Sequence, residues 1–403
     1  MDNCKYLEPF EEALSLKTVN EEVDRCLLCL DAPCSAACPA GTDPAKFIRS
    51  VRFLNYAGAA ETVRENNPLG AICARVCPTE RYCQKGCSRS GIDRPIDIGR
   101  IQQFVTDYEA AHNMKILAKG PSNGKKVAIV GAGPSGLSAA ATLARLGYAV
   151  EIFDKNKDAG GYLRYGIPEY RLPNEVVDRE IKRIEGLGVK IHTSEKIDQK
   201  KLDELKKKYD AVVMAIGASE GKMLPMFAGA KNVVTAVDFL ANVKSHAGKV
   251  ELPKNVLVIG GGDVAMDTIT SLKLLGVEQI TDVVYETFAE FKASKKELQG
   301  AQKLGVSILD GYMPTAFNKD TVEFTHRYKE SKLSVKADLI ILAVGQVSEL
   351  GDIKDITLTK GEGLDNGKVF VTGDIAHGEK TVVYGVRTGK EVAYRIDAYL
   401  EGK

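Results

Sequence analysis

The chain has 403 residues, 44% of them hydrophobic, and a formal net charge of +1, so it can bury the cores of two or three domains. The near-zero charge gives no electrostatic footprint for nucleic acid or an anionic membrane surface, and we expect neither as a partner. No apolar run approaches the ~18 residues that a membrane-spanning helix requires, so we also expect no membrane association.

The first part of the chain is rich in cysteine, because eight of the nine cysteines lie between Cys26 and Cys87. They follow the pattern Cys26-x2-Cys29-x4-Cys34-x3-Cys38-Pro39, then Cys73-x3-Cys77-Pro78, then Cys83-x3-Cys87. Cys-Pro steps of this kind are typical of ferredoxin-type iron–sulfur runs, in which one run can supply thiolates to two clusters. Eight thiols are enough for two four-iron clusters.

Three other uses of these thiols are open: disulfide bonds, structural zinc, and buried thiols that act as small apolar side chains. Disulfides need an oxidising compartment, but the first residues, Met1-Asp2-Asn3-Cys4-Lys5, lack the pattern of a secretory signal, and we expect a cytoplasmic protein. Zinc ribbons repeat a C-x2-C pair, and only Cys26-x2-Cys29 has that spacing. The spacing therefore favours iron–sulfur clusters.

The elements expected in this first part are helices. Two short helices are predicted at residues 43–54 and 57–65, and an apolar stripe at helical spacing predicts another at 98–108. The polar, turn-rich segment 119–126 follows and is the clearest domain boundary. We therefore predict a helical iron–sulfur domain over residues 1–118.

A first glycine turn follows a strand expected at residues 127–130 and precedes a helix expected at 137–146. The glycines permit a tight turn and close approach to a pyrophosphate, and the helix N-terminus favours its charge. The next strand ends in Asp154, 23 residues after Gly131, where a carboxylate would meet ribose hydroxyls. The candidate residues of this dinucleotide site are Gly131, Gly133, Pro134, Ser135, Gly136, Asp154 and Lys155.

A second glycine turn follows a strand expected at residues 255–259 and precedes a helix that ends near Leu275. The next strand leads into Glu286, 26 residues after Gly260. Two such units in one chain predict a flavin site and a nicotinamide site, FAD and NAD(H). The candidate residues of the second site are Gly260, Gly262, Asp263, Val264, Ala265 and Glu286.

A strand near the C-terminus, residues 369–372, ends in Gly373-Asp374. In flavin disulfide-reductase-like proteins such a strand returns to the first nucleotide domain, and its aspartate binds the ribityl chain of FAD. The alternative is that Asp374 caps the helix that begins near Thr381. The triplets that end in Gly217 and Gly345 resemble the short turns that close the flavin and nicotinamide domains, respectively.

The predicted fold is α/β: a helical iron–sulfur head followed by two Rossmann-like nucleotide-binding domains. The FAD-binding domain is discontinuous, at residues 119–232 and 347–403, and the NAD-binding domain is inserted at 233–346.

This order of modules resembles the glutamate synthase small-subunit family, which includes the N-terminal half of dihydropyrimidine dehydrogenase. The chain is most similar there to the NAD-dependent, FAD-carrying small subunits of the bacterial dehydrogenases. The segments that carry the resemblance, along nearly the whole chain, are Cys26-Leu27-Leu28-Cys29-Leu30-Asp31-Ala32-Pro33-Cys34, Asn67-Pro68-Leu69-Gly70, Gly160-Gly161, Gly166-Ile167-Pro168, Arg171-Leu172-Pro173 and Thr381-Val382-Val383-Tyr384.

The resemblance implies a specific set of cluster ligands, in which a glutamine replaces one thiol. Cys73 is not a ligand in this set, and Gln102 takes its place. The alternative for Gln102 is an ordinary surface amide. The implied ligands are Cys26, Cys29, Cys34 and Cys87 for one four-iron cluster, and Cys38, Cys77, Cys83 and Gln102 for the other.

The resemblance also implies contacts with the flavin. Arg171 would lie near the isoalloxazine ring, as the one tentative catalytic residue, although it could equally be a loop salt-bridge residue. The backbone at Thr381 and Val382, at a helix N-terminus, would stabilise negative charge on the reduced flavin. Gly161, in the Gly160-Gly161 pair that carries part of the resemblance, would join the FAD site.

The implied function is electron input: electrons pass from NADH through FAD and two four-iron clusters to a catalytic subunit with FMN and further clusters, which reduces uracil or thymine at the 5,6 bond. A heterotetramer is the expected assembly. The alternatives are the small subunit of glutamate synthase or of a ferredoxin-dependent transhydrogenase, and a non-catalytic electron-transfer scaffold. NADH is expected as coenzyme because Glu286 would repel a 2′-phosphate, although Lys292, Lys295 and Lys296 lie nearby.

Overall fold

The computed structural model describes residues 4–402 apart from 11, 355, 357, 360–361, 364–366 and 377–378. The chain divides into two compact units, which are described separately below. The small unit contains Met1–Phe10, Tyr165–Pro173 and Ser219–Val347, and the large unit contains Glu11–Arg164, Asn174–Ala218 and Ser348–Lys403. The predicted nicotinamide domain, 233–346, therefore falls inside the small unit, while residues 11–118 of the predicted head and the first nucleotide sheet share the large unit.

The head of the large unit is helical, as predicted, and every regular element between residues 12 and 125 is a helix. Asp43 caps α4, since its carboxylate accepts a hydrogen bond from the Lys46 amide at 3.2 Å. Ile101 and Val105 of α7 are buried in a core with Phe47. The elements are α2 (Leu16–Asp24), α3 (Pro33–Ala36), α4 (Pro44–Arg52), α5 (Tyr56–Asn66), α6 (Gly70–Val76), η1 (Thr79–Arg81), η2 (Ser88–Gly91) and α7 (Ile98–Ala111).

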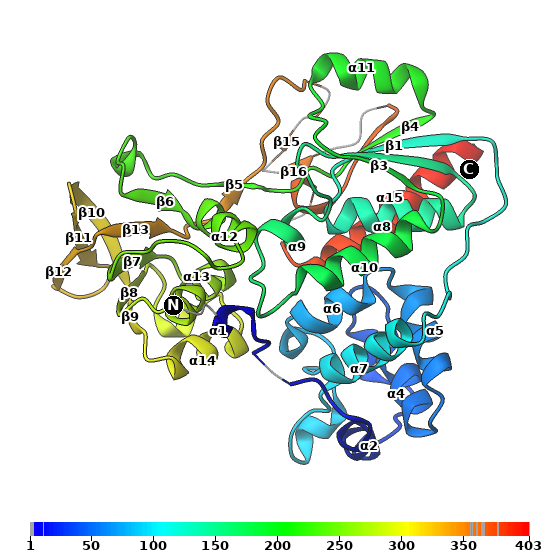
Figure 1. The fold of residues 1–403 in the computed structure, drawn as a ribbon, viewed down its shortest axis with the longest axis horizontal. Helices are drawn as coiled ribbons and strands as arrows, with labels where there is room; N and C mark the ends of the chain where they lie inside the picture. Colours follow the sequence, from blue (N-terminus) through cyan, green and yellow to red (C-terminus); the bar gives the residue numbers. More distant parts are fainter. Residues whose placement is uncertain are drawn as a thin grey trace. The chain divides into compact units, whose positions relative to one another are not determined.

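The rest of the large unit is a five-stranded parallel sheet in the order β17-β4-β1-β2-β3. Val369 of β17 pairs with Val212 of β4, so the C-terminal strand returns to the first nucleotide sheet as predicted. Helix α11 covers one face, and α8, α10 and α15 cover the other (Figure 1). The strands are β1 (Lys126–Val130), β2 (Ala149–Phe153), β3 (Lys190–His192), β4 (Ala211–Met214) and β17 (Val369–Val371).

In the sheet domain of the large unit, the long C-terminal helix α15 packs on α8, the helix that follows the first glycine turn. The Ser138 hydroxyl of α8 donates to the Val386 carbonyl of α15 at 2.8 Å. The remaining elements are α8 (Pro134–Arg145), α9 (Tyr162–Tyr165, whose last residue falls in the small unit), α10 (Asn174–Glu185), α11 (Gln199–Lys208), β15 (Leu358–Thr359), β16 (Glu362–Gly363), η5 (Gly373–Ile375) and α15 (Val382–Glu401).

A buried ion network joins the head to the sheet domain of the large unit. Arg64 of α5 is 0% exposed, and its guanidinium donates to Glu109 of α7 and Glu180 of α10, with the shortest contact to each at 2.7 Å. Arg183 adds a contact to Glu109 at 3.1 Å. Burial alone would lower the pKa of Arg64, but the two carboxylates raise it above its ordinary value. The network fixes α5 and α7 against α10.

The small unit has a second five-stranded parallel sheet, in the order β6-β13-β7-β8-β9. One face packs on α12, α13 and α14, and the other on an antiparallel sheet, β10-β11-β12, that the sequence did not predict (Figure 1). The elements are α1 (Cys4–Leu7), β5 (Glu220–Gly221), η3 (Pro225–Phe227), β6 (Val233–Thr235), α12 (Ala236–Ser245), β7 (Asn255–Ile259), α13 (Asp263–Leu274), β8 (Gln279–Val284), η4 (Phe288–Glu290), α14 (Lys295–Lys303), β9 (Ser307–Asp310), β10 (Tyr312–Asn318), β11 (Thr321–His326), β12 (Lys332–Lys336), β13 (Leu339–Leu342) and β14 (Gln346–Val347).

Among the helices described, none is both long enough and apolar enough to span a membrane.

Candidate functional site

The first glycine turn joins β1 to α8 and can be built only with glycine. Gly131 has φ +106°, and a Cβ there would lie 2.4 Å from the Ala215 carbonyl oxygen. A Cβ at Gly136 would lie 2.0 Å from the Gly131 carbonyl oxygen. At Gly133, the N-cap of α8, no atom lies within 4 Å of an added Cβ. Tight packing on one side and open space at the helix N-terminus fit a bound pyrophosphate.

Asp154 follows β2 and lies against this turn. One carboxylate oxygen accepts from the Ala132 amide at 2.7 Å and the other from the Asn156 amide at 2.8 Å. Gly161 also packs on the turn, because a Cβ there would lie 2.9 Å from the Gly133 Cα. Lys155 differs, since its ammonium pairs with Glu349 at 3.0 Å. The turn and Asp154 together fit the ribose and pyrophosphate of a dinucleotide.

The C-terminal strand brings Gly373 and Asp374 to the same turn. Gly373 has φ +77°, and a Cβ there would lie 2.4 Å from the Ser135 hydroxyl. Burial raises the pKa of Asp374 to about 6, and Lys380 opposes that shift. Asp374 is not the cap of the following helix: Thr381 is, and its side chain accepts from the Tyr384 amide at 3.4 Å. Asp374 therefore keeps its place beside the turn without a capping role.

Two helix N-termini meet at this site. Val382 begins α15, and one turn later a Cβ at Gly385 would lie 3.1 Å from the Pro134 Cβ, where α8 begins. The positive ends of both helix dipoles therefore lie close together, which favours a negatively charged group. Gly217, which follows β4, has φ +65° and open space at its Cβ position. The large unit thus brings together most of the residues predicted for FAD.

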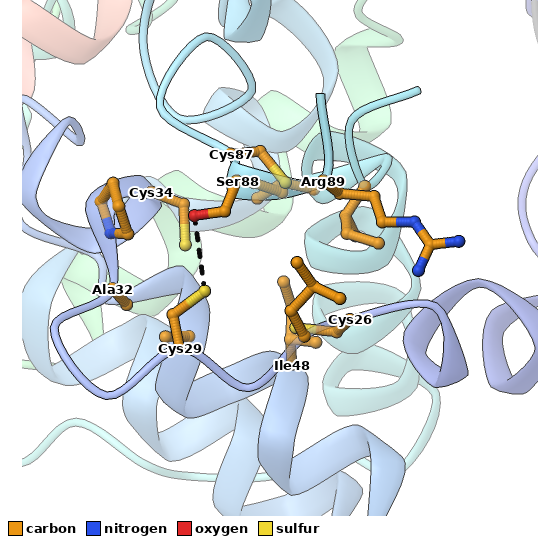
Figure 2. A pocket seen from close by; sticks show the side chains of 13 residues that line it. Cys26, Cys29, Ala32, Cys34, Ile48, Cys87, Ser88 and Arg89 are labelled. Atoms are coloured by element: carbon orange, nitrogen blue, oxygen red, sulfur yellow. Dashed lines mark hydrogen bonds between the residues drawn. The ribbon is translucent and has the colours of Figure 1, made fainter. Parts of the chain in front are cut away.

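In the head, four cysteines surround one pocket. Figure 2 shows Cys26, Cys29, Cys34 and Cys87 around a common space, with Arg89 pointing away. Burial raises the pKa of the Cys34 thiol to about 11, and the neighbouring Cys87 and Cys26 add to the shift. The Cys29 thiol donates to the Ser88 hydroxyl at 3.5 Å. These four cysteines, the first thiol group, are the four assigned to one cluster by the resemblance.

The remaining thiols form a second thiol group of Cys38, Cys73, Cys77 and Cys83. Burial raises the pKa of Cys77 well above its ordinary value, and Cys73, Cys83 and Cys38 are close enough to raise it further. Cys73 is 4% exposed, and burial raises its pKa to about 12. Two of the four residues, Cys73 and Cys83, are therefore buried, and the group has one thiol more than the resemblance requires.

Gln102 is a buried amide of α7 and not a surface one, being 7% exposed. Its Nε2 donates to the Gly70 carbonyl at the start of α6, at 2.8 Å. Helix α6 carries Cys73 and ends next to Cys77. This bond ties the Gln102 amide to the first residue of the helix that carries Cys73.

The eight cysteines from Cys26 to Cys87 are free in this structure, so the disulfide alternative does not describe it. Four of them surround one pocket, an arrangement that fits an inorganic cluster, in which each sulfur binds a different iron.

The small unit repeats the glycine turn between β7 and α13. Gly260 has φ +148°, and a Cβ there would lie 2.3 Å from the Ala343 carbonyl oxygen. Gly262, the N-cap of α13, has open space at its Cβ position. Glu286 follows β8, and its carboxylate pairs with Lys292 at 2.9 Å. The turn, the helix N-terminus and the acid fit a second dinucleotide.

The loop after Glu286 folds back over this turn. The Ser294 amide donates to the Asp263 carboxylate at 2.6 Å, and the Ala293 amide donates to the Gly261 carbonyl at 3.2 Å. Val264 and Ala265 follow in the first turn of α13. The predicted residue Gly345, in contrast, comes after β13, has φ +108° and accepts from the Lys222 amide through its carbonyl.

Arg171 lies in the small unit as a partly buried salt-bridge residue. Its guanidinium contacts both carboxylate oxygens of Asp267, at 2.6 and 2.7 Å, and Glu297 at 3.0 Å. These partners lie on α13 and α14. The contacts are those of the salt-bridge alternative, and the expected proximity to the isoalloxazine stays a prediction.

Sequence reasoning missed two residues that connect the head to the flavin-type site. Tyr82, next to Cys83, hydrogen-bonds Thr381, and its ring centroid lies 5.9 Å from that of Tyr384, with the two rings tilted by 49°. Lys390 of α15 donates to the carbonyls of Ala40 and Asn66, at 2.8 and 2.7 Å. The sequence signal that could have identified Tyr82 is its position between two candidate cluster ligands, Cys77 and Cys83. The second thiol group therefore lies on the side of the head that faces the start of α15.

These features define a two-dinucleotide flavoprotein with an iron–sulfur head. Two family models agree: pyridine nucleotide-disulphide oxidoreductase over residues 125–389, and dihydropyrimidine dehydrogenase domain II, 4Fe-4S cluster, over residues 3–114. Thioredoxin reductase of T. acidophilum has the same fold, with 20% identity, a TM-score of 0.54, and coverage of 69% of this chain and 99% of that chain. Mycobacterium tuberculosis FprA in complex with NADPH is similar, with 16% identity, a TM-score of 0.58, and coverage of 70% and 85%.

Two relatives identify the family more closely. Each is named NAD-dependent dihydropyrimidine dehydrogenase subunit PreT, from Salmonella typhimurium and from Escherichia coli K12. Both are 49% identical to the chain, over 408 and 409 residues, and the match covers 100% of this chain and 99% of each relative. The chain belongs to the PreT family of NAD-dependent dihydropyrimidine dehydrogenase subunits. The resemblance predicted from sequence is confirmed.

Proposed function

We propose that the chain is the electron-input subunit of a dihydropyrimidine dehydrogenase. It would take electrons from NADH and deliver them to a partner subunit that reduces uracil or thymine to the 5,6-dihydropyrimidine. When bound, FAD accepts a hydride and releases single electrons, and the clusters carry single electrons. The observation that supports this most is that the thiol groups and the flavin-type turn share one compact unit.

The order of the groups in the large unit supports a direction of electron flow. Tyr82, next to Cys83, hydrogen-bonds Thr381 at the start of α15, beside the flavin-type turn. Lys390, farther along α15, donates to the carbonyls of Ala40 and Asn66 in the head. The two thiol groups are neighbours, because Cys34 of the first is close enough to raise the pKa of Cys83 of the second. Loops that carry the first group expose Leu30, which is 94% accessible. Electrons would therefore enter at the second group and leave at the first.

The ligand sets are part of the proposal. Cys26, Cys29, Cys34 and Cys87 would hold one four-iron cluster, and the single pocket they surround supports this set. Cys38, Cys77, Cys83 and Gln102 would hold the other, and the buried, tethered amide of Gln102 supports this set. Cys73 would stay a thiol next to the cluster.

The chain's own residues would bind and orient the two dinucleotides. Around FAD, the open space at Gly133 would admit the pyrophosphate, and Asp154 would accept from the ribose hydroxyls. Asp374 and the N-terminus of α15 would hold the ribityl chain and the negative charge of the reduced ring. Around the nicotinamide coenzyme, Gly262 and Glu286 would have the corresponding roles, and Glu286 would favour NADH.

The partner would carry FMN and iron–sulfur clusters, in a heterotetramer with this chain. The support is that both relatives are named as subunits of a dehydrogenase, and that the described elements form a head and two nucleotide domains. A cytoplasmic location fits eight free thiols, which a reducing compartment preserves. The small subunits of glutamate synthase and of a transhydrogenase remain alternatives with less support.

Reconstitution tests the proposal. The purified chain should reduce an artificial dye with NADH, which a non-catalytic scaffold would not do. Added to the catalytic subunit of a dihydropyrimidine dehydrogenase, the chain should support NADH-dependent reduction of uracil. Dye reduction without uracil reduction, together with glutamate formation in the presence of a glutamate synthase large subunit, would instead establish the alternative.

A further inference from the structure

We propose that the small unit contains a neutralised 2′-phosphate subsite. Lys292 and Arg327 are placed to bind the 2′-phosphate of a coenzyme, and Glu286 and Glu290 pair with them. The inference rests on the proposed nicotinamide site and concerns its choice of coenzyme. It makes Glu290, which belongs to no nucleotide-binding motif, a determinant of specificity beside Glu286.

The first pair lies at the end of β8. The Lys292 ammonium is 2.9 Å from the Glu286 carboxylate. That carboxylate lies beside the glycine turn, because a Cβ at Gly261 would stand 3.6 Å from Glu286 Oε2. In a dinucleotide domain this is where the adenosine ribose meets the acid. The lysine side chain is 76% exposed, so its ammonium approaches the ribose position from the solvent.

The second pair is brought to the same strand end by the antiparallel sheet. Arg327 follows β11, and its guanidinium carbon lies 4.0 Å from the Tyr285 ring centroid and 4.7 Å from that of Tyr328. Its Nη1 donates to the Tyr285 carbonyl and to the Glu290 carboxylate, both at 3.0 Å. The guanidinium is thus fixed over the residue that directly precedes Glu286.

Glu290 is itself held in place for this pairing. Its Oε2 accepts from the Thr287 amide at 3.0 Å and from the Thr287 hydroxyl at 3.2 Å. These bonds form the capping box of η4, a short turn that begins two residues after Glu286. The acid that neutralises Arg327 is therefore positioned by the loop that would contact the ribose.

The charge balance explains how the subsite would discriminate. Each of the two cations is paired with a carboxylate, and Asp310 adds a further acid at this strand end, where its carboxylate accepts from the Phe288 amide at 2.9 Å. A phosphate dianion would therefore have to displace both paired acids to reach its donors. A free 2′-hydroxyl needs only an acceptor, which Glu286 supplies. Removing both acids would leave an ammonium and a guanidinium, the groups that bind phosphate best. NADH selection would then come from the acids and not from a lack of cations.

Binding of two small nucleotides tests the inference without using the flavin. Adenosine 2′,5′-bisphosphate and 5′-AMP are titrated calorimetrically into the full chain and into Glu286→Gln, Glu290→Gln and the double variant. Glutamine preserves the capping box at position 290. The double variant should bind the bisphosphate at least ~10-fold more tightly than the native chain, a factor that corresponds to ~1.4 kcal/mol. Adding Lys292→Met and Arg327→Leu should remove the gain.

A matched control removes a carboxylate from the same antiparallel sheet without freeing a cation. Glu323 of β11 accepts from the Ser334 hydroxyl at 2.8 Å, and Glu323→Gln should leave bisphosphate affinity unchanged. If Glu290→Gln gains no more than this control and the double variant gains nothing, the inference is overturned while the nicotinamide site stands. If the native chain binds neither nucleotide, the nicotinamide site and the inference both fail.

Discussion

Replacing Arg64 with methionine should lower the stability of the large unit more than replacing a charged residue at its surface. The side chain is 0% exposed, and so are both of its partners, Glu109 and Glu180. Methionine keeps most of the length and volume of the arginine stem, so the change removes the charge and its hydrogen bonds rather than creating a large cavity.

The expected loss of stability follows from the charges that remain after Arg64 is removed. Arg64 makes two contacts of 2.7 Å, one to each glutamate. Without it, the two buried acids would share the cation of Arg183, which contacts both Glu109 and Glu180. Removing one partner of a buried ion pair typically costs ~3–5 kcal/mol because a charge is left uncompensated. We expect a loss of that size in the free energy of unfolding.

The assay is urea unfolding of the loaded chain under anaerobic conditions, followed by circular dichroism. The control is Arg75→Ala, which removes a 2.8 Å contact with Asp107. Asp107 is 34% exposed and keeps a 3.1 Å contact with Arg179, so no buried charge is left unpaired and we expect a smaller loss. Adding Glu109→Gln and Glu180→Gln to Arg64→Met should restore part of the loss. Equal stability of Arg64→Met and Arg75→Ala would refute the reasoning.

Three further predictions test the clusters, a buried acid and the coenzyme. Gln102→Ala should lose about half of the roughly eight irons per chain, while Cys73→Ser should keep them all; the reverse result in iron analysis and absorption would show the ligand set to be wrong. Asp282 is fully buried, its two oxygens have no hydrogen-bond partner in the described part of the chain, and burial raises its pKa well above the ordinary 3.8. Because the folded pKa is raised, the protonated acid contributes its full stability below pH 3.8, and this stability is lost as the pH rises through the folded pKa. The free energy of unfolding of Asp282→Asn should therefore increase relative to that of the native chain as the pH rises. A difference between the two proteins that is the same at every pH would argue against this. Glu286→Arg should narrow or reverse a preference for NADH that we expect to be at least ~10-fold in kcat/KM, and equal use of NADPH by the native chain would count against the role of the acid.

Short sequence motifs were sufficient to predict the parts of the site that are formed by residues close together in the sequence. The turns at Gly131 and Gly260 follow from glycines placed between a strand and a helix, because a Cβ at either position would collide with a neighbouring carbonyl. Asp154 and Glu286 follow from their distance along the chain to those turns. The C-terminal strand was also predictable, from the Gly373-Asp374 step at its end.

The features that were missed depend on contacts between distant residues. Arg64 and Glu180 are far apart in sequence, and neither belongs to a motif. Arg327 reaches the nucleotide site from an antiparallel sheet whose strand β10 has an irregular pattern of exposure that no strict alternation would reveal. Gln102 lies at the edge of an apolar stripe, where a buried and an exposed amide look alike in sequence. The grouping of the thiols came from the resemblance and not from their spacing.

In the proposed function, electrons leave the flavin through the clusters of the head. Under anaerobic conditions, NADH is mixed with the native chain and with Cys38→Ser, and flavin absorbance and the electron paramagnetic resonance of the clusters are followed together. We predict that both proteins lose flavin absorbance at similar rates, and that the clusters of the native chain alone become fully reduced and support uracil reduction by the partner. Uracil reduction at the native rate by an iron-depleted Cys38→Ser chain would contradict an electron route through the head clusters.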